Sequence, residues 1–138
     1  MLFGTSESAV PDDLVPYTRN LGYMTNEQLR RLYSVADVFV APSLEDNLPN
    51  TVIESMAAGT PVVGFDTGGI GDMIEHGRTG YLADHGDADD LADGIAWVLD
   101  DSERREQLGR QARARAVEQY DILTVAHQYR TLYEDILA

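Results

Sequence analysis

The sequence predicts an α/β protein, a Rossmann-like parallel sheet with helices on both faces. Short, fully apolar segments alternate with helix-like segments over residues 1–83. Such segments are typical of parallel strands that are buried on both faces. The 138 residues include 43% hydrophobic residues, enough for one core and too few residues for two ordinary domains. We therefore expect residues 1–138 to form a single domain.

Five strand segments are expected from apolar, β-branched and aromatic residues bounded by proline or glycine. They are residues 2–4, a short strand within 14–21 near Val15 and Tyr17, and residues 37–41, 61–65 and 79–83. The glycine-rich residues 66–71 are predicted to form a turn. Residues 84–90, which are rich in aspartate, are predicted to cap the helix that follows.

Helices are predicted between and after these strands. Thr25 and Gln28 have the spacing of a capping box, and a helix is expected over 51–58 that ends at Gly59. The apolar stripe of the first helix is expected to be Leu29, Leu32, Val35 and Ala36. Residues 122–136 have the clearest apolar face, which predicts that Tyr129 and Tyr133 lie in a core or an interface.

Composition excludes several classes of function. The net charge of −14 disfavours nucleic acid and bare membrane as general partners. The absence of cysteine excludes disulfides, thiolate zinc sites and cysteine nucleophiles, and fits a cytoplasmic protein. No apolar run approaches the roughly 20 residues of a membrane-spanning helix, and no signal peptide is visible. The three histidines are scattered, so no metal site is expected.

The charged residues have an unusual make-up. All ten basic residues are arginine, and aspartate outnumbers glutamate among the 24 acids. This composition fits a protein kept soluble at high salt and fits equally a coding bias without salt adaptation. Both readings stay open, because composition of this kind bears on solubility rather than on fold.

The segment from the strand at 37–41 into the next helix carries the clearest chemistry. In open α/β sheets, ligands bind beyond the carboxyl ends of the strands. The helix that begins near Asn50 or Thr51 offers free amides and a positive dipole end to an anion. Glu54 lies about one turn inside and can accept hydrogen bonds from a vicinal diol, and Asp46 lies at the loop tip. A nucleoside diphosphate sugar offers the matching series of sugar hydroxyls, diphosphate and ribose.

Gly68 and Gly69 follow the strand at 61–65 and allow the backbone to approach a ligand closely. A plain turn is the alternative for this pair. Surface carboxylates are likewise the alternative for Asp46 and Glu54, since acidic side chains are normally exposed.

Four pieces of the sequence together resemble a known family. They are LYSVADVFVAPS at 32–43, ESMAAGTPVV at 54–63, TGG at 67–69 and TGYL at 79–82. This combination resembles the donor-binding half of the family 4 retaining glycosyltransferases (glycosyl transferases group 1) of GT-B fold. The DNLPNT loop at 46–51 resembles the branch found in exopolysaccharide and capsule assembly. The resemblance covers nearly the whole chain and weakens over the last two helices.

The resemblance implies roles for individual residues. The family carries two acids separated by seven residues, which correspond to Asp46 and Glu54. Glu54 is then expected on the donor ribose and Asp46, where most members have glutamate, near the donor sugar. Pro49 stands where many members have glycine and supplies no amide, so the phosphate would rest on the amides of Asn50 and Thr51. The remaining residues expected to line the donor site are Asn47, Leu48, Gly68 and Gly69, with Tyr23 and Met24 beside the base.

The resemblance also implies what the chain does. We expect it to bind a UDP- or GDP-sugar, without metal or cofactor, for hexosyl transfer to a glycan or glycolipid acceptor. The family's N-terminal acceptor domain and first βα unit have no counterpart here, so we expect no activity alone. We expect the missing domain to be a partner in cis or in trans, and self-association through the face that it would leave exposed. The alternatives are a non-catalytic α/β interaction or regulatory module, and a fragment of a GT-B-like nucleotide-sugar epimerase.

Overall fold

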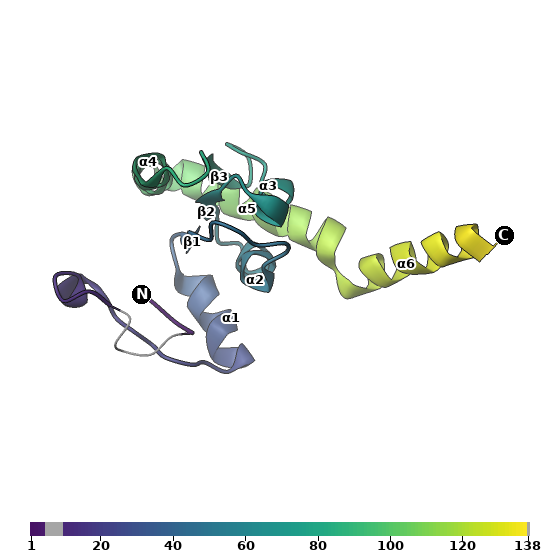
Figure 1. The fold of residues 1–138 in the computed structure, drawn as a ribbon, viewed down its shortest axis with the longest axis horizontal. Coiled ribbons are helices and arrows are strands. Elements are labelled where there is room, and N and C mark those ends of the chain that lie inside the picture. The colour runs from purple at the N-terminus through teal and green to yellow at the C-terminus, as the bar shows by residue number, and fades with distance from the viewer. Residues whose placement is uncertain (5–9, 138) are drawn as a thin grey trace. The chain divides into compact units, whose positions relative to one another are not determined.

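The computed structural model describes residues 1–4 and 10–137, and it divides the chain into two units, Met1–Leu32 and Tyr33–Ala138. The elements, shown in Figure 1, are a 3-10 helix (Val15–Tyr17), α1 (Asn26–Val35), β1 (Phe39–Ala41), α2 (Asn50–Ala58), β2 (Val62–Phe65), α3 (Gly68–Met73), β3 (Gly80–Ala83), α4 (Ala88–Leu99), α5 (Ser102–Tyr120) and α6 (Ile122–Leu137).

The first unit is held by a short parallel pairing between its ends. Leu2 bridges to Asn20; its amide donates to the Arg19 carbonyl at 2.9 Å, and the Leu21 amide donates back to its carbonyl at 2.8 Å. Residues 2–4 thus pair as a strand end would.

The strand predicted near Val15 and Tyr17 is wrong, because these residues form a 3-10 helix. The Tyr17 amide donates to the Leu14 carbonyl at 3.0 Å. Pro16 gives the physical reason, since proline has no amide for a strand ladder and its fixed φ suits a tight turn.

The predicted capping box at the start of α1 is confirmed. The Thr25 amide donates to Gln28 Oε1 at 2.8 Å, and the Gln28 amide donates to Thr25 Oγ1 at 3.3 Å. The predicted apolar stripe of this helix is wrong at its end, because Val35 is 72% exposed. Tyr33 takes the buried position in that last turn instead. Its ring is edge-on to that of Phe39, with 5.6 Å between the ring centroids.

The second unit is built on a parallel sheet with the strand order β1-β2-β3. Phe39 pairs with Val62 and Val62 pairs with Gly80, so the three strands begin in register. Each of the three strands predicted in this unit is present and is one or two residues shorter than expected. The parallel arrangement places the carboxyl ends of all three strands at one edge.

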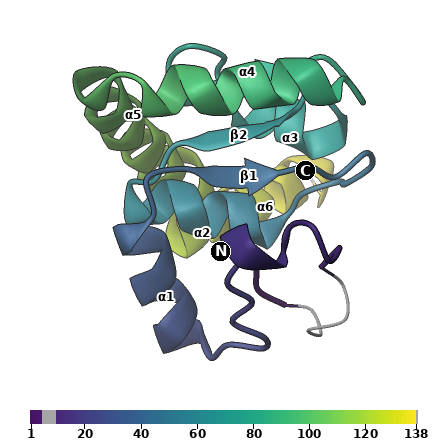
Figure 2. The same cartoon turned by 90° about the vertical axis from the view of Figure 1, so that its left-hand side faces the viewer.

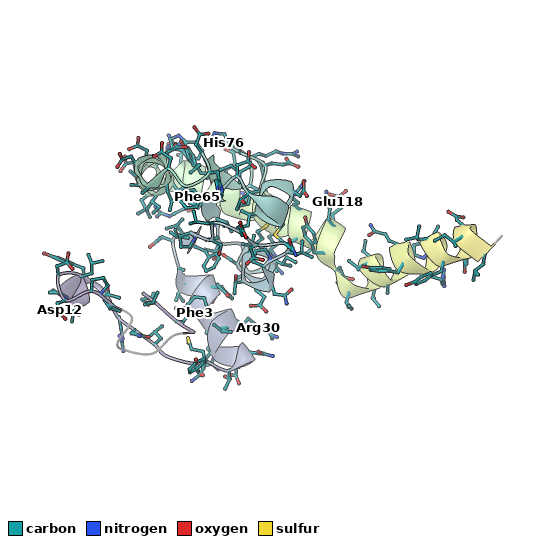
Figure 3. The ribbon with its side chains drawn as sticks, viewed as in Figure 1. Phe3, Asp12, Arg30, Phe65, His76 and Glu118 are labelled. Atoms are coloured by element: carbon teal, nitrogen blue, oxygen red, sulfur yellow. The ribbon has the colours of Figure 1, made fainter. Side chains whose placement is uncertain are left out.

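Helices cover both faces of this sheet, as predicted, and Figure 2 shows α4 and α2 on opposite sides of β1 and β2. The side chains alternate between two cores along each strand. Val62 faces the core formed with α2, α3 and the later part of α5. Val63 and Phe65 face the core formed with α4 and the start of α5, which also contains Leu108. Figure 3 labels Phe65 within these layers and Glu118 on α5.

The turn predicted for residues 66–71 is wrong in part, because α3 begins at Gly68. Ile70 and Met73 are both fully buried, and their spacing of three residues places them on the same helical face. Burial of these two side chains outweighs the low helix propensity of the glycines around them.

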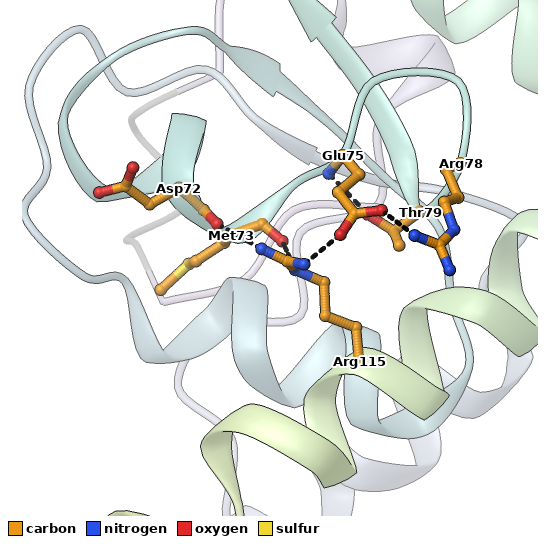
Figure 4. Close-up of polar contacts among 6 residues, drawn as sticks. All are labelled: Asp72, Met73, Glu75, Arg78, Thr79 and Arg115. Atoms are coloured by element: carbon orange, nitrogen blue, oxygen red, sulfur yellow. Dashed lines mark hydrogen bonds and ion pairs between the residues drawn. The ribbon is translucent and has the colours of Figure 1, made fainter.

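Arg115 of α5 fixes the far end of α3. Its Nε donates to the Met73 carbonyl and one Nη to the Asp72 carbonyl, both at 2.8 Å. The other Nη binds the Glu75 carboxylate, which also accepts from Arg78 at 2.7 Å (Figure 4). The guanidinium thereby satisfies carbonyls that the end of a helix leaves without partners.

The helices α2 and α5 cross at two glycines. Gly59 ends α2, as predicted, with a left-handed φ of 83°. A Cβ at Gly109 of α5 would run into the Gly59 carbonyl oxygen. The crossing therefore requires that Gly109 has no side chain.

The start of α4 and the exposure of α6 complete the unit. The carboxylate of Asp87 accepts from the amides of Asp89 and Asp90, so the predicted cap is confirmed.

None of the described residues of α6 is buried, although the apolar pattern predicted a core or an interface. A place for Tyr129 and Tyr133 in the core is wrong, since they are 57% and 59% exposed. In Figure 1 this helix extends away from the sheet, which leaves its apolar stripe uncovered.

We expect Gly109→Ala to destabilise the protein by about 2 kcal/mol, because the new methyl group overpacks the α2–α5 crossing. Helix propensity alone predicts the opposite sign, a gain of about 1 kcal/mol. Urea unfolding measures the difference. Gln107→Ala, at an exposed position of the same helix, is the matched control and should change stability by less than about 0.5 kcal/mol. A G109A variant as stable as the parent would contradict the steric role of Gly109.

Candidate functional site

The candidate site lies at the carboxyl edge of the sheet. The strands β1, β2 and β3 end at Ala41, Phe65 and Ala83, and their following loops start from the same edge because the strands are parallel. Ligands of open α/β sheets bind at this edge. The loop after β1, residues 42–49, contains predicted site residues, and the loop after β2, residues 66–67, leads into the predicted Gly68 and Gly69 at the start of α3.

Two hydrogen bonds join these loops. The Gly69 amide donates to the Asp46 carbonyl at 3.1 Å, and the Thr67 hydroxyl donates to the Leu44 carbonyl at 3.0 Å. The backbone of Asp46 is therefore fixed by the start of α3, whereas its half-buried side chain is not part of either bond.

The two predicted glycines are needed for this contact. A Cβ at Gly68 would run into the Asp46 carbonyl oxygen, and a Cβ at Gly69 would run into that of Asn47. Gly68 also has a φ of 46°, a conformation that side chains disfavour. The close approach that the sequence predicted at these glycines is thus made to the neighbouring loop, and their contact with a ligand stays a prediction.

The helix α2 begins with an open N-terminus. It starts at Asn50 after Pro49, no side chain forms a cap hydrogen bond, and its first turn contains no acidic residue. The Val52 amide is satisfied by the Pro49 carbonyl at 3.0 Å. The first amides and the positive end of the helix dipole can therefore receive an anion.

Glu54 lies one turn into α2 on its exposed side. Its neighbours Val52, Ser55 and Met56 are fully buried, which fixes the helix against the sheet. The rotation of the helix about its axis therefore keeps the Glu54 side chain in solvent. The carboxylate is available to accept hydrogen bonds from a ligand.

Tyr33 is a residue that sequence reasoning missed. It is 2% exposed, and its pKa is raised to about 12, first by burial and then by the negative charge of Glu54. The motif that contains Tyr33 was recognised, but its place on the helix was not. The only sequence signal for the burial of Tyr33 was that this amphipathic residue lies next to Leu32 of the predicted apolar stripe.

The structure brings some of the predicted residues together and leaves others in separate parts. Asp46, Asn47, Gly68 and Gly69 are in contact through the two loops. Asn50, Thr51 and Glu54 share the first turns of α2, and Leu48 before them is 54% exposed. Tyr23, which is 87% exposed, and the half-buried Met24 belong to the first unit.

The described residues, 1–4 and 10–137, contain neither a cluster of metal ligands nor a membrane-spanning helix. No group of three or more histidines, cysteines, aspartates or glutamates among them could hold a metal ion. Within the same residues, no helix is both long enough and apolar enough to cross a membrane.

The raised pKa of Tyr33 predicts a loss of stability in alkali. The pKa is 10.0 for an ordinary tyrosine and about 12 in the fold, so the unfolded chain ionises first and stability falls as the pH rises from 10 to 12. Between pH 8 and 11 the parent should lose about 1 kcal/mol more than Tyr33→Phe in urea unfolding. Equal losses in the two proteins would contradict the raised pKa of Tyr33.

Comparison with known proteins agrees with this geometry. The family described as "Glycosyl transferases group 1" matches residues 17–115, more than two thirds of the chain. An N-acetyl-alpha-D-glucosaminyl L-malate synthase of Bacillus anthracis is 33% identical over 111 residues, which are 80% of this chain and 29% of that protein. Sulfoquinovosyl transferase SQD2 of Arabidopsis thaliana is 39% identical over 103 residues, which are 72% of this chain and 20% of that protein.

Solved structures show the same fold. Sucrose-phosphate synthase from Thermosynechococcus elongatus matches 91% of this chain with a TM-score of 0.83 and 31% identity, over 31% of its own length. Anabaena Alr3699/HepE in complex with UDP-glucose matches 88% of this chain with a TM-score of 0.80 and 26% identity, over 34% of its length.

This chain thus spans about a fifth to a third of the length of the relatives named here. Its parallel sheet, flanked by helices, is that of part of a GT-B glycosyltransferase. The family match, the identities and the shared fold lead to one conclusion: the chain belongs to the glycosyl transferases group 1 family.

Proposed function

We propose that residues 1–138 form the donor-binding part of a retaining glycosyltransferase, which transfers a hexosyl group from a nucleoside diphosphate sugar to a glycan or glycolipid. One observation carries the proposal. The exposed carboxylate of Glu54 lies one turn inside an uncapped helix N-terminus, and the loop before that helix is fixed at Asp46. A single segment thus contains, in order, a carboxylate that can accept hydrogen bonds from hydroxyl groups, a helix N-terminus that can bind an anion, and a second such carboxylate.

Each group has a role that its chemistry supports. The amides of Asn50 and Thr51 bind the diphosphate, because they are N–H donors at the positive end of a helix. Glu54 accepts hydrogen bonds from the two ribose hydroxyls, and Asp46 faces the donor sugar. As a carboxylate, Asp46 can also stabilise the positive charge that develops on the sugar during transfer.

The other predicted residues complete the donor site in this proposal. Asn47, Leu48 and Pro49 line the loop beside the sugar and the phosphate, and Gly68 and Gly69 hold that loop. Tyr23 and Met24 belong to the first unit, and their place beside the base stays a prediction from the sequence. UDP is the first nucleotide to test, because the Anabaena relative was solved with UDP-glucose. GDP and ADP are the alternatives.

Transfer also needs an acceptor, held against the donor in a site that excludes water. We assign acceptor binding to a further domain, supplied in cis or in trans, and contact with that domain to the exposed stripe of α6. The DNLPNT loop supports an acceptor from polysaccharide assembly. We place the reaction in the cytoplasm, where nucleotide sugars would be available to the donor site.

The 138-residue chain should bind a nucleoside diphosphate through Glu54. Calorimetry with UDP, GDP and ADP at up to millimolar concentration should show binding of at least one of them. Glu54→Ala should weaken that binding by about tenfold or more, because two hydrogen bonds to a charged group are lost.

Glu118→Ala is the matched control for that experiment. Glu118 is an exposed glutamate on α5, so its removal should leave the affinity unchanged. Circular dichroism checks that both variants are folded. Absence of binding to all three nucleotides would overturn the proposal in favour of an interaction module, and equal affinity of Glu54→Ala and the parent would overturn the role of Glu54.

The chain by itself should not transfer sugar. Incubation with UDP-glucose or GDP-mannose and a glycolipid acceptor should release no nucleoside diphosphate above the blank, since nothing positions the acceptor. Chromatography of the nucleotide sugar afterwards distinguishes a further outcome. Sustained release of the diphosphate would contradict the assignment of acceptor binding to another domain, and conversion to an epimer would favour the epimerase alternative.

A further inference from the structure

A cavity of about 270 Å³ lies in the second unit, between α5 and the turn that precedes β3. Residues of the turn Glu75–Thr79 line one side of it, and residues from the later part of α5 line the other. The turn leads into β3 at Gly80, so the cavity lies at the amino edge of the sheet. The proposed donor site lies at the carboxyl edge and shares no residue with this cavity.

The walls of the cavity are fixed by hydrogen bonds and ion pairs. The Glu75 carboxylate accepts from Arg78 at 2.7 Å and from Arg115, whose other two guanidinium nitrogens donate to backbone carbonyls (Figure 4). The Glu75 amide donates to the Thr79 hydroxyl at 2.9 Å, which closes the turn. The shape of the cavity is therefore set before any ligand binds.

The charges of the lining favour an uncharged ligand. Two arginines and two glutamates line the cavity, so the formal charges cancel. Arg78 and Arg115 repel a cation, and the glutamates repel an anion. A neutral polar molecule avoids both costs.

Gln111 gives the cavity an acceptor that lacks a donor. Its Oε1 atom is buried, and no group in the described part of the chain forms a hydrogen bond with it. A buried acceptor without a partner costs free energy, which a donor from a ligand recovers. The Gln111 side chain is only half-buried and lines the cavity, and the last torsion of a glutamine is broad. A small rotation of the amide therefore brings Oε1 to the cavity wall.

The other lining groups complete the chemistry of the ligand. Arg78 is 69% exposed and has further N–H groups that can donate, and the Gln119 amide both donates and accepts. A ligand that serves them all must carry several groups that donate and accept, which is the property of hydroxyls. The volume is just below the range of about 300–1,000 Å³ for drug-sized ligands, so it suits one small ring.

We propose that this cavity binds one neutral sugar ring, with one hydroxyl donating to Gln111 Oε1 and another oxygen accepting from Arg78. The site is separate from the donor site, and the inference does not depend on the proposed function. Two sources present the same chemistry, a free hexose and a hexose unit of a glycan chain.

Nuclear magnetic resonance of the ¹⁵N-labelled chain locates the binding. We would titrate it with glucose, galactose, mannose and maltotriose to high millimolar concentration. At least one of them should shift amide signals of residues 75–79 and 111–119 and leave those of residues 46–54 in place. Tighter binding of maltotriose than of glucose assigns the site to a glycan, and equal affinities assign it to a free hexose.

Gln111→Met keeps the length of the side chain and removes the acceptor. It should weaken sugar binding by about 3- to 10-fold, because one hydrogen bond is lost. Gln107→Met, the same change at an exposed position of α5, is the matched control and should leave the affinity unchanged. If circular dichroism shows that Gln111→Met is unfolded, Arg78→Gln removes the proposed donor at an exposed position and should weaken binding in the same way.

Four results would overturn the inference. They are the absence of shifts with every sugar, shifts confined to residues 46–54, equal affinities of Gln111→Met and the parent, and tighter binding of charged glucosamine or glucuronate than of glucose. Failure of the proposed function is seen separately, because a chain that binds sugar at residues 111–119 but no nucleoside diphosphate would lose the donor site and keep this one.

Discussion

The contact between the Asp46–Leu48 backbone and the Gly68–Gly69 pair is the constraint on which the carboxyl edge depends. Adjacent parallel strands bring the two loops side by side, but any side chain at either glycine would push them apart. The Gly69 amide then satisfies the Asp46 carbonyl, and Arg115 satisfies carbonyls at the other end of α3. The backbone of the loop before α2 is thus fixed at Leu44 and Asp46, although the loop has little regular structure.

An acidic chain that binds a diphosphate must use a local attraction against a repulsive overall charge. The net charge is −14 and no lysine is present. The open N-terminus of α2 supplies that attraction with fixed amides rather than with a mobile cation. The carboxylates of Asp46 and Glu54, which come before and after this N-terminus in the sequence, disfavour an anion that has no hydroxyl groups beside its charge. In the proposed function, this arrangement would favour a ligand in which hydroxyl groups flank the phosphates, as they do in a nucleotide sugar.

Stability and ligand recognition are linked through the buried residues beneath Glu54. Val52 and Met56 face one core of the sheet, and Ser55 and Thr60 connect α2 to the last turn of α1. The residues that hold the helix in the fold therefore also determine where the Glu54 side chain lies. Gly59 and Gly109 at the other end of α2 set the depth at which the helix lies against α5.

The sequence alone was sufficient for the parallel sheet, the Thr25 capping box, the end of α2 at Gly59 and the family, because each depends on residues that are close in the sequence. It was not sufficient for α3, for the exposure of α6 or for Tyr33. The glycines of α3 favour a turn, and the helix forms because Ile70 and Met73 are buried in the folded chain. The apolar stripe of α6 does not by itself indicate whether another surface covers it. The burial of Tyr33 against Phe39 was decided only by the tertiary structure, because burial and long-range contacts exist only once the chain has folded.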